Sequence, residues 1–347
     1  MQENDSSNAC AACKPPVRLM AMRWLLPCLA LLAAGGALAE ARIDQAKNEG
    51  EVVWYTAMSV PDTDVLRKPF VERYPFLKLT VLRATGEKVR TRILTEARAN
   101  RFAWDLVSFN LLDMDALAAE GLLAAYRSPE AATGYAPGAV DPQGRWAAIY
   151  VRQYVIGYNT RLVKPDEAPR SWSDLLAPRW SGKLALDESD VEWYAAMLDY
   201  WGRDKALGYM RALSRQKPQQ RRGHSLLTRL LVAGDFPLAL VHAAEIEKEK
   251  QEGAPVEWVR TLDPVVTSPS QVAISARAPH PAAARLFVDF LLSGEGQALI
   301  RSRGRVPART GIDTDAETLK VHYVDPRLAA EFNRYEKEFR EIFGRVP

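Results

Sequence analysis

The strongest candidate for binding chemistry is the acidic segment Asp187-Glu188-Ser189-Asp190-Val191-Glu192-Trp193-Tyr194. Its carboxylates could bind a metal or an ammonium group, and Trp193 could add a cation–π contact. The same pattern also suits a helix start, since Ser189 or Asp190 can cap a helix and acidic side chains complement its dipole. Tyr194 shares the helical spacing of apolar positions and could equally be a core residue. The candidate ligand contacts from this segment are Asp187, Asp190, Trp193 and Tyr194.

A basic segment, Arg221-Arg222-Gly223-His224-Ser225, precedes a second predicted helix. Free backbone N–H groups at a helix start, together with an arginine, can bind an anion. A solvated basic loop with a serine cap is the alternative. If the acidic and basic segments face one cleft, the ligand would carry an anionic and a cationic end, or would be a metal chelate. The candidate contacts here are Arg222, His224 and Ser225.

His242 and Glu245 have the spacing of neighbours on one helix face, and could supply two metal ligands. One His–Glu pair is too few to define a metal site. The charged residues 247–250 that follow are equally typical of a solvated helix face. We keep His242 as a candidate ligand contact, leave the presence of a metal open and expect no cofactor.

Enzyme signatures are missing from the sequence, which has no GxSxG, HExxH, GxxxxGK[ST] or GxGxxG motif. The chain has four histidines, and they are scattered, which offers little for acid–base catalysis. We therefore expect a binding protein and not an enzyme. Two alternatives remain open: a ligand-sensing module for a membrane receptor, and an exported hydrolase.

The first 39 residues predict export. The apolar run 24–32 follows a cationic start and leads to the small-residue triplet Ala37-Leu38-Ala39, which is the layout of a secretory signal peptide. The run is short for a membrane span, so an N-terminal anchor is the less favoured alternative. Residues 1–19 are polar and unlike a signal peptide, and we expect translation to start at Met20 or Met22.

Composition narrows the class of protein further. All three cysteines, Cys10, Cys13 and Cys28, precede the predicted cut, so the mature chain would form no disulfides. A formal charge of +3 over 347 residues gives no reason to expect nucleic acid or a membrane surface as a partner. The remaining length suits two lobes of ordinary size. We expect a monomeric protein located in the periplasm.

Short β-rich runs alternate with amphipathic helical stretches, which predicts an α/β fold. In the first half, strands at 51–56, 77–83 and 104–109 are separated by helices at 65–74 and 85–99. This order is half of a doubly wound sheet, in which ligands bind at the carboxyl ends of the strands. The candidate contacts at or next to those ends are Thr56, Ser59, Arg83, Ser108 and Asn110.

Two later segments, 147–158 and 264–275, read as long strands without a crossover helix, and a second α/β pattern lies between them. A chain that leaves one lobe, builds a second and returns needs two crossings, so these segments are the predicted hinge strands. The predicted fold is two doubly wound α/β lobes. Its parts are the signal peptide 1–39, lobe 1 from 40–150 and 269–347, and lobe 2 from 151–268.

Several segments, in the same order, resemble the solute-binding proteins of bacterial ABC importers, extracellular family 1, with the type II periplasmic binding fold. The similarity is greatest to the ferric-iron-binding branch. The segments are Gly50-Glu51-Val52-Val53-Trp54-Tyr55-Thr56, then 157–163 (GYNTRLV), 169–183 (PRSWSDLLAPRWSGK), 253–259 (GAPVEWV), 278–284 (APHPAAA) and 294–297 (GEGQ).

This resemblance implies a periplasmic protein that clamps a small molecule or metal chelate between two lobes and delivers it to an inner-membrane ABC permease. Ferric binders of this branch typically hold iron with tandem tyrosines in lobe 2, helped by a His and a Glu from lobe 1. Here the position of the tyrosines holds His242-Ala243-Ala244-Glu245, and the lobe 1 positions hold Ser59 or a neighbour, and Asn110. Because phenolate oxygens suit Fe(III), the resemblance implies iron-type transport without implying iron itself.

Overall fold

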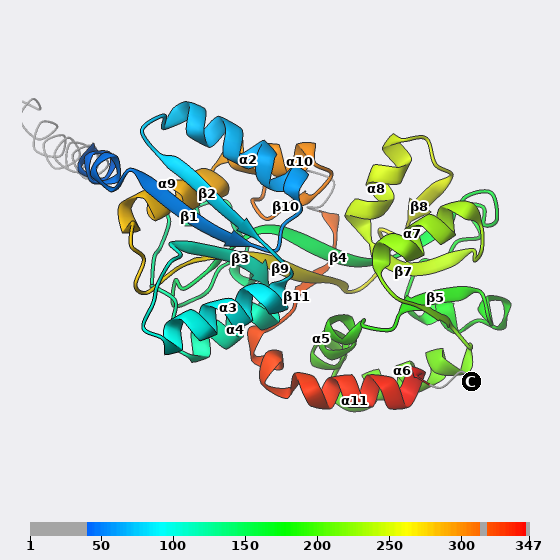
Figure 1. Ribbon diagram of the computed structural model, residues 1–347. Helices are drawn as coiled ribbons and strands as arrows, with labels where there is room; N and C mark the ends of the chain where they lie inside the picture. The colour runs from blue at the N-terminus through cyan, green and yellow to red at the C-terminus, as the bar shows by residue number, and fades with distance from the viewer. Residues whose placement is uncertain (1–39, 313–317, 345–347) are drawn as a thin grey trace, which may run out of the picture.

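The protein consists of two α/β lobes, in a computed structural model that describes residues 40–312 and 318–344 (Figure 1). The predicted signal peptide, residues 1–39, lies outside the described residues. Within the described part of the chain, no helix has both the length and the apolar character needed to cross a membrane.

Lobe 1 is built on a parallel sheet in the order β2-β1-β3, with helices on both faces (Figure 1). The strands pair in register, with Thr56 beside both Arg83 and Ser108. The carboxyl ends of all three strands therefore reach the same edge, as the alternating pattern predicts. The elements are β1 (Glu51–Thr56), α2 (Val60–Arg73), β2 (Lys78–Arg83), α3 (Gly86–Arg98), β3 (Leu106–Asn110) and α4 (Leu111–Ala119).

The two predicted long strands are present as β4 (Ala147–Asn159) and β9 (Val265–Ile274), which pair antiparallel and run from one lobe into the other. Their lobe 1 halves extend the sheet, with β9 beside β3. Tyr154 marks the crossing point, because it pairs with Val266 of β9 and with His242 of lobe 2. The two strands therefore form a hinge between the lobes, as predicted.

Lobe 2 continues the sheet beyond Tyr154 in the order β4-β7-β5-β6. Strands β5, β6 and β7 are parallel, so helices that follow them begin at one edge of the sheet. The elements are β5 (Leu184–Asp187), α5 (Val191–Trp201), α6 (Arg203–Arg215), β6 (Gln219–Arg221), α7 (His224–Ala233), β7 (Leu238–His242), α8 (Ala243–Gln251) and β8 (Val256–Trp258).

The C-terminal part differs from the prediction that residues 269–347 belong to lobe 1. Helices α9 (Pro281–Leu292) and α10 (Gly294–Ser302) and strand β10 (Val306–Pro307) do lie in lobe 1. The chain then crosses a third time: β11 (Val321–Tyr323) pairs with the lobe 2 half of β9, and α11 (Phe332–Phe343) packs under lobe 2 (Figure 1). The reason is packing, since the apolar face of α11 covers the apolar face of α5.

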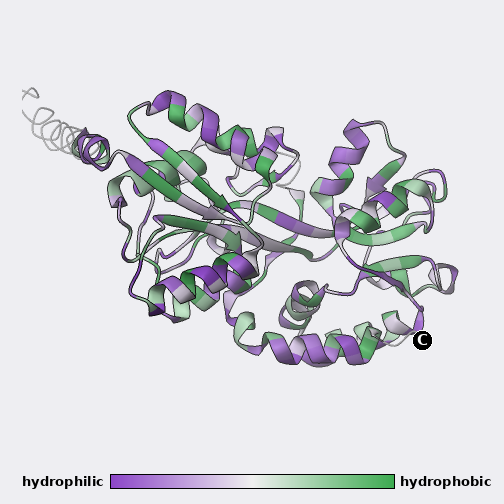
Figure 2. Cartoon of the chain, in the orientation of Figure 1, coloured by the Kyte–Doolittle hydropathy of each residue, from purple (hydrophilic) through white to green (hydrophobic). Residues whose placement is uncertain are grey.

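Each lobe has its own hydrophobic core. In lobe 1, Trp54, Phe70 and Phe287 pack together on one face of the sheet, while a second cluster with Trp104 covers the other face. In lobe 2, apolar residues of α5, α6 and α11 form a continuous core with the sheet. Figure 2 shows the corresponding pattern of apolar strands inside and polar helix faces outside. Most of each core therefore comes from its own lobe, an arrangement that is compatible with hinge bending between lobes.

Candidate functional site

The largest described cavity lies between the lobes and has a volume of about 540 Å³, in the range typical of small-molecule sites. Both lobes contribute to its walls. Lobe 1 contributes the start of α2 and the segment after α10, while lobe 2 contributes the first turns of α7 and α8. The lining residues include Ser59, Asp62, Ser302, Arg303 and Arg305 from lobe 1, and Ser225, Thr228, Arg229, Ala244, Glu245 and Lys248 from lobe 2.

Two arginines are fixed on the lobe 1 wall. Ser59 caps α2 by accepting a hydrogen bond from the Asp62 N–H at 3.3 Å. The nearly buried Asp62 carboxylate then pairs with Arg305 at 3.0 Å and with Arg303 at 3.3 Å. Gly304, with a φ of 70°, makes the turn between the two arginines. The lobe 1 wall therefore presents two guanidinium groups, held by one carboxylate, next to a helix N-terminus.

The lobe 2 wall is polar and carries acceptors. The Glu245 carboxylate accepts hydrogen bonds from the Ser225 hydroxyl at 3.2 Å and from the Thr228 hydroxyl at 3.0 Å. These contacts join the first turns of α7 and α8. The exposed part of α8 adds further charges of both signs, namely Lys248, Glu249 and Glu252.

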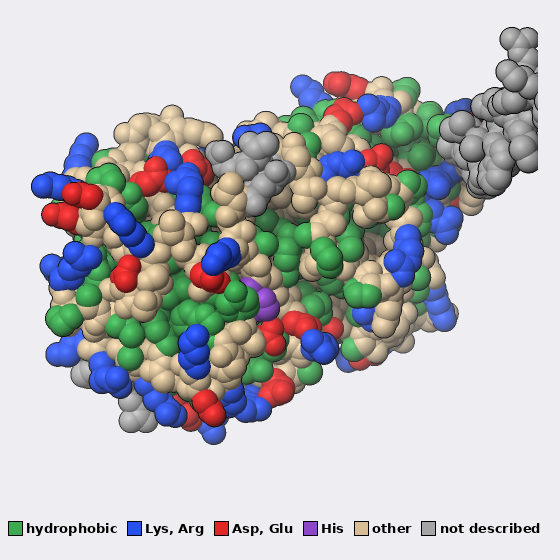
Figure 3. Space-filling view, turned by 180° about the vertical axis from the view of Figure 1, so that it is seen from behind, with side chains coloured by type: hydrophobic (Ala, Val, Ile, Leu, Met, Phe, Trp, Pro, Cys, Tyr) green, Lys and Arg blue, Asp and Glu red, His purple; other side chains and the backbone are tan. Residues whose placement is uncertain are grey.

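The electrostatics of the cavity combine both signs with three helix N-termini. Helices α2, α7 and α8 all begin at its wall, and a helix N-terminus carries a partial positive charge and free N–H donors. Figure 3 shows, from behind, that Lys, Arg, Asp and Glu side chains are interspersed over both lobes outside the cavity. The cavity is therefore suited to a ligand that has an anionic group and also hydrogen-bond donors for the lobe 2 carboxylates.

A buried histidine pair lies beside the cavity at the hinge. The His224 Nε2 atom is 3.1 Å from the Oδ1 atom of Asp190, and the Asp190 side chain is fully buried. The His224 and His242 ring centroids are 3.9 Å apart, and both rings contact the ring of Tyr154 edge-on. His224 Nδ1 and His242 Nε2 are buried without a hydrogen-bond partner. The pair therefore connects the start of α7 and the end of β7, both in lobe 2, to the hinge strand β4.

The two histidines have opposite protonation preferences. Burial opposes a charge on His224, but the Asp190 carboxylate outweighs it and raises the pKa of His224 above its ordinary value. Burial lowers the pKa of His242 well below its ordinary value, and the charges of His224, Arg152 and Arg305 lower it further. Of the two rings, His224 is therefore the one that more readily takes up an added proton.

A second polar network holds the hinge strands to α5. The Glu192 carboxylate accepts hydrogen bonds from Ser268 at 2.9 Å, from Arg152 at 3.0 Å and from Tyr154 at 3.2 Å. Arg152 also donates to Ser268 at 2.8 Å. Because Arg152 and Tyr154 belong to β4 and Ser268 to β9, Glu192 ties both hinge strands to lobe 2.

The predicted lobe 1 contacts are only partly in the cavity. Ser59 lines it. Thr56 and Ser108 are fully buried and bond to each other through their hydroxyl oxygens at 2.7 Å, so they hold neighbouring strands together and do not face a ligand. Asn110 caps α4, and Arg83 donates to a backbone carbonyl oxygen at 3.3 Å. The strand ends meet as expected, but their polar side chains mostly satisfy nearby backbone and hydroxyl groups.

The predicted ligand contacts of the acidic segment, residues 187–194, differ most from the structure. Trp193 and Tyr194 are fully buried in the core of lobe 2, where Tyr194 packs on Phe339 of α11, so they are core residues and not ligand contacts. Asp187 is buried as well and accepts a hydrogen bond from the Gly223 N–H at 2.6 Å, which fixes the loop before α7. Asp190 is the partner of His224. Asp187 therefore fixes the loop before α7, and Asp190 fixes His224, beside the cavity and not in it.

The residues of the basic segment that precede Gly223 and those that follow it lie in different parts of lobe 2. Arg222 has an 89% exposed side chain, lies 3.5 Å from Glu188 and faces a different cavity beside α11, so it is not a cleft residue. Ser225 lines the inter-lobe cavity, and His224 and His242 lie next to it. The sequence analysis did not identify Arg229, Lys248, Arg303 or Arg305, although two arginines on either side of a glycine, at 303–305, were a usable signal.

Two further observations concern other kinds of site. Within residues 40–312 and 318–344, no group of three or more His, Cys, Asp or Glu side chains is arranged to hold a metal ion.

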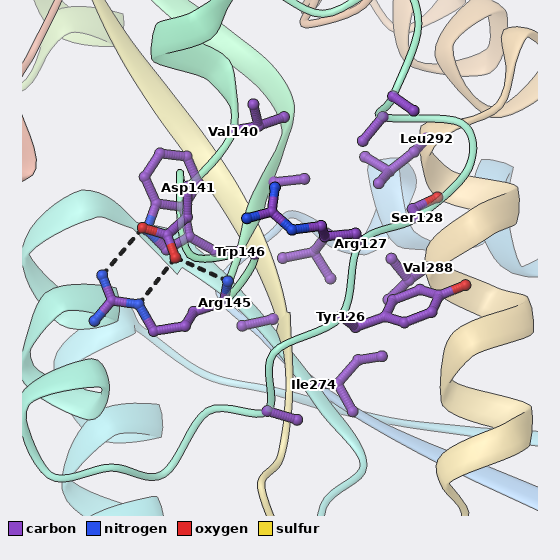
Figure 4. A pocket seen from close by; sticks show the side chains of 17 residues that line it. Tyr126, Arg127, Ser128, Val140, Asp141, Arg145, Trp146, Ile274, Val288 and Leu292 are labelled. Atoms are coloured by element: carbon purple, nitrogen blue, oxygen red, sulfur yellow. Dashed lines mark hydrogen bonds and ion pairs between the residues drawn. The ribbon is translucent and has the colours of Figure 1, made fainter.

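A smaller cavity of about 120 Å³ lies inside lobe 1 (Figure 4), where Arg145 is paired with Asp141 at 2.9 Å and the Ser128 hydroxyl donates to Asp289 at 2.6 Å. The polar side chains at this cavity already have partners within the protein, so we place the candidate solute site between the lobes.

Known proteins match this chain over most of its length. An uncharacterized protein of Haemophilus influenzae is 28% identical over 287 residues, covering 79% of this chain and 81% of the relative. Iron-bound HitA from Pseudomonas aeruginosa has a TM-score of 0.72 at 21% identity, covering 83% of this chain and 99% of HitA. AfuA from Actinobacillus pleuropneumoniae, with fructose-6-phosphate bound, has a TM-score of 0.69 at 24% identity, covering 86% and 99%.

These structural matches confirm the predicted type II periplasmic binding fold. The family is given by a separate match: the family model for the bacterial extracellular solute-binding proteins matches residues 108–327, which include both hinge strands and all of lobe 2 except α11. The chain belongs to the bacterial extracellular solute-binding proteins.

Proposed function

We propose that this protein is the periplasmic solute-binding component of an ABC importer, and that its solute is a small organic anion that also carries hydroxyl or ammonium groups. The observation that carries the proposal is the two-sided cavity. Arg303 and Arg305 stand on lobe 1 beside the N-terminus of α2, and acceptors led by Glu245 face them from lobe 2.

The chemistry of the two walls is complementary to such a solute. A phosphate or carboxylate would form charge-assisted hydrogen bonds with the guanidinium groups, which are stronger than neutral hydrogen bonds. Ligand hydroxyl or ammonium groups would donate to the carboxylates of α8. One relative's name supports this class of solute, since AfuA is described with fructose-6-phosphate bound. HitA is described as iron-bound and a Serratia marcescens relative as Fe(3+)-binding, which is a different class of solute and the reason that the test includes ferric citrate.

Transport requires binding and no bond chemistry. A solute that contacts both lobes binds the closed arrangement better than the open one, so it shifts the hinge equilibrium toward closure. The closed surface would then be recognised by the membrane permease. We expect the protein to act as a monomer and to turn over no substrate.

The test is ligand-induced stabilisation of the mature protein. The panel contains hexose phosphates, dicarboxylates, zwitterionic amino acids, polyamines and ferric citrate. A ligand present at 100 times its Kd stabilises the folded state by about 2.7 kcal/mol, which a thermal-shift assay detects as a rise in Tm. Native mass spectrometry of the freshly purified protein identifies any solute that it retains. Stabilisation by ferric citrate or polyamines alone, with no effect of the organic anions, would contradict the proposed solute class.

A further inference from the structure

The histidine pair is not explained by the packing of lobe 2. Hydrogen bonds are expected for buried polar atoms, yet one ring nitrogen of each histidine is buried and unpartnered. His224 directly precedes Ser225, and His242 lies two residues before Ala244, so each histidine is within two residues of one that lines the inter-lobe cavity. The pair also contacts Tyr154, the residue at which β4 crosses between the lobes. These positions place a titratable group between the cavity and the hinge.

We propose that His224, paired with Asp190 and in ring contact with His242, gains a positive charge by taking up a proton, and that this uptake is coupled to binding of an anion in the cleft. This inference rests on the proposed function, because it requires an anionic solute. It adds a regulatory property to that site: affinity for the anion is high when His224 is charged and falls when His224 loses its proton.

The charges around each ring determine where the proton resides. His224 faces Asp190 before α5, Asp187 at the end of β5 and Glu245 on α8, all of which favour its charged form. His242 faces His224, Arg152 of β4 and Arg305 from lobe 1, all of which disfavour a second charge. With ring centroids 3.9 Å apart, two imidazolium groups would repel each other strongly. The pair therefore accepts one added proton, and so one positive charge, more readily than two.

An anion next to Arg305 would change this balance. Arg305 is close enough to His242 and Glu245 to interact with both across the cleft, so an anion bound there adds negative potential at the histidine pair. Negative potential favours the protonated form of His224 and raises its pKa further. By linkage, the anion then binds more tightly at a pH below the pKa of His224 than at a pH above it.

The experiment uses sulfate as the probe, because sulfate does not titrate between pH 6 and 8.5. Imidazole resonances can be followed by NMR, since the chain has only four histidines. In the wild-type protein, we expect sulfate to raise the midpoint of one histidine titration, and the affinity for sulfate to be about tenfold lower at pH 8.5 than at pH 6. His224→Gln keeps an N–H donor for Asp190 but cannot titrate, so its affinity should be independent of pH.

The matched control is His322→Gln, because His322 forms a similar pair with Asp199 at 3.1 Å but does not line the cavity. It should retain the wild-type pH dependence. The coupling is overturned if wild-type affinity for sulfate is constant over the pH range, or if His224→Gln keeps the pH dependence. It is also overturned if sulfate does not bind at any pH while an organic anion of the panel does, an outcome that leaves the proposed function standing. If no anion binds, both proposals fail.

Discussion

Replacing Arg305 with glutamine should weaken binding of an anionic solute by about 10- to 150-fold. Arg305 lies in the cavity wall with a one-third exposed side chain, and Asp62 orients its guanidinium group at 3.0 Å. A hydrogen bond to a charged group contributes about 1.5–3 kcal/mol, and each 1.4 kcal/mol is a tenfold change in Kd. Glutamine keeps one donor but removes the charge, so the loss should fall within this range.

The effect on stability should be small by comparison. The nearly buried Asp62 carboxylate keeps Arg303 as a partner at 3.3 Å, so the substitution does not leave it as an unpaired buried charge. Arg222→Gln is the matched control, since it removes the same charge from an 89% exposed side chain outside the cavity. Isothermal titration calorimetry with the best solute of the panel gives Kd for both variants, and circular dichroism confirms that they fold. The reasoning is refuted if folded Arg305→Gln binds within twofold of the wild type, or if Arg222→Gln loses as much affinity.

Four further predictions concern the hinge and the core. Trp193→Ala should destabilise lobe 2 by about 3–5 kcal/mol in a denaturant titration, because it empties a buried site; a variant of full stability would contradict the core assignment. Phe339→Ala should cost about as much, because it loosens α11 from α5. Glu192→Gln should lower Tm and broaden the range of hinge angles seen by small-angle X-ray scattering, whereas an unchanged profile would show that the network does not restrain the hinge. As pH falls below about 6.5, His242 is protonated more readily in the unfolded chain than in the folded chain, so the free energy of unfolding should decrease. Urea titrations at pH 5 and 7 measure this decrease, and the His242→Asn variant should lack the part of it that comes from His242.

The fold could be predicted from the sequence because each element has a local signal. The alternation of apolar strands and amphipathic helices predicted the two lobes, and the two long strand-like segments predicted β4 and β9. The third crossing was not predictable in this way. The amphipathic pattern of α11 shows that it packs on something, but the pattern does not identify α5 as the partner, which is more than a hundred residues away in sequence.

The candidate site shows the same division between local and long-range information. Ser225 and His224 were identified because a basic segment before a helix is a local pattern. Arg305 was missed because its role depends on Asp62, which is 243 residues away in the sequence. Trp193 was misassigned because its aromatic ring suits a core position as well as a binding site, and only the packing of Trp172 against it, with centroids 5.6 Å apart, decides between them.

The position of α11 has a consequence for how the protein forms. The core of lobe 2 includes Tyr335, Phe339 and Phe343, so the apolar face of α5 stays uncovered until the last dozen residues of that core have been synthesised. Lobe 1 can assemble around its own core earlier, because its sequence-distant strands and helices are complete by residue 307. A chain that ends before residue 332 should therefore retain a folded lobe 1 and an aggregation-prone lobe 2, and docking of α11 becomes the step that completes the native structure.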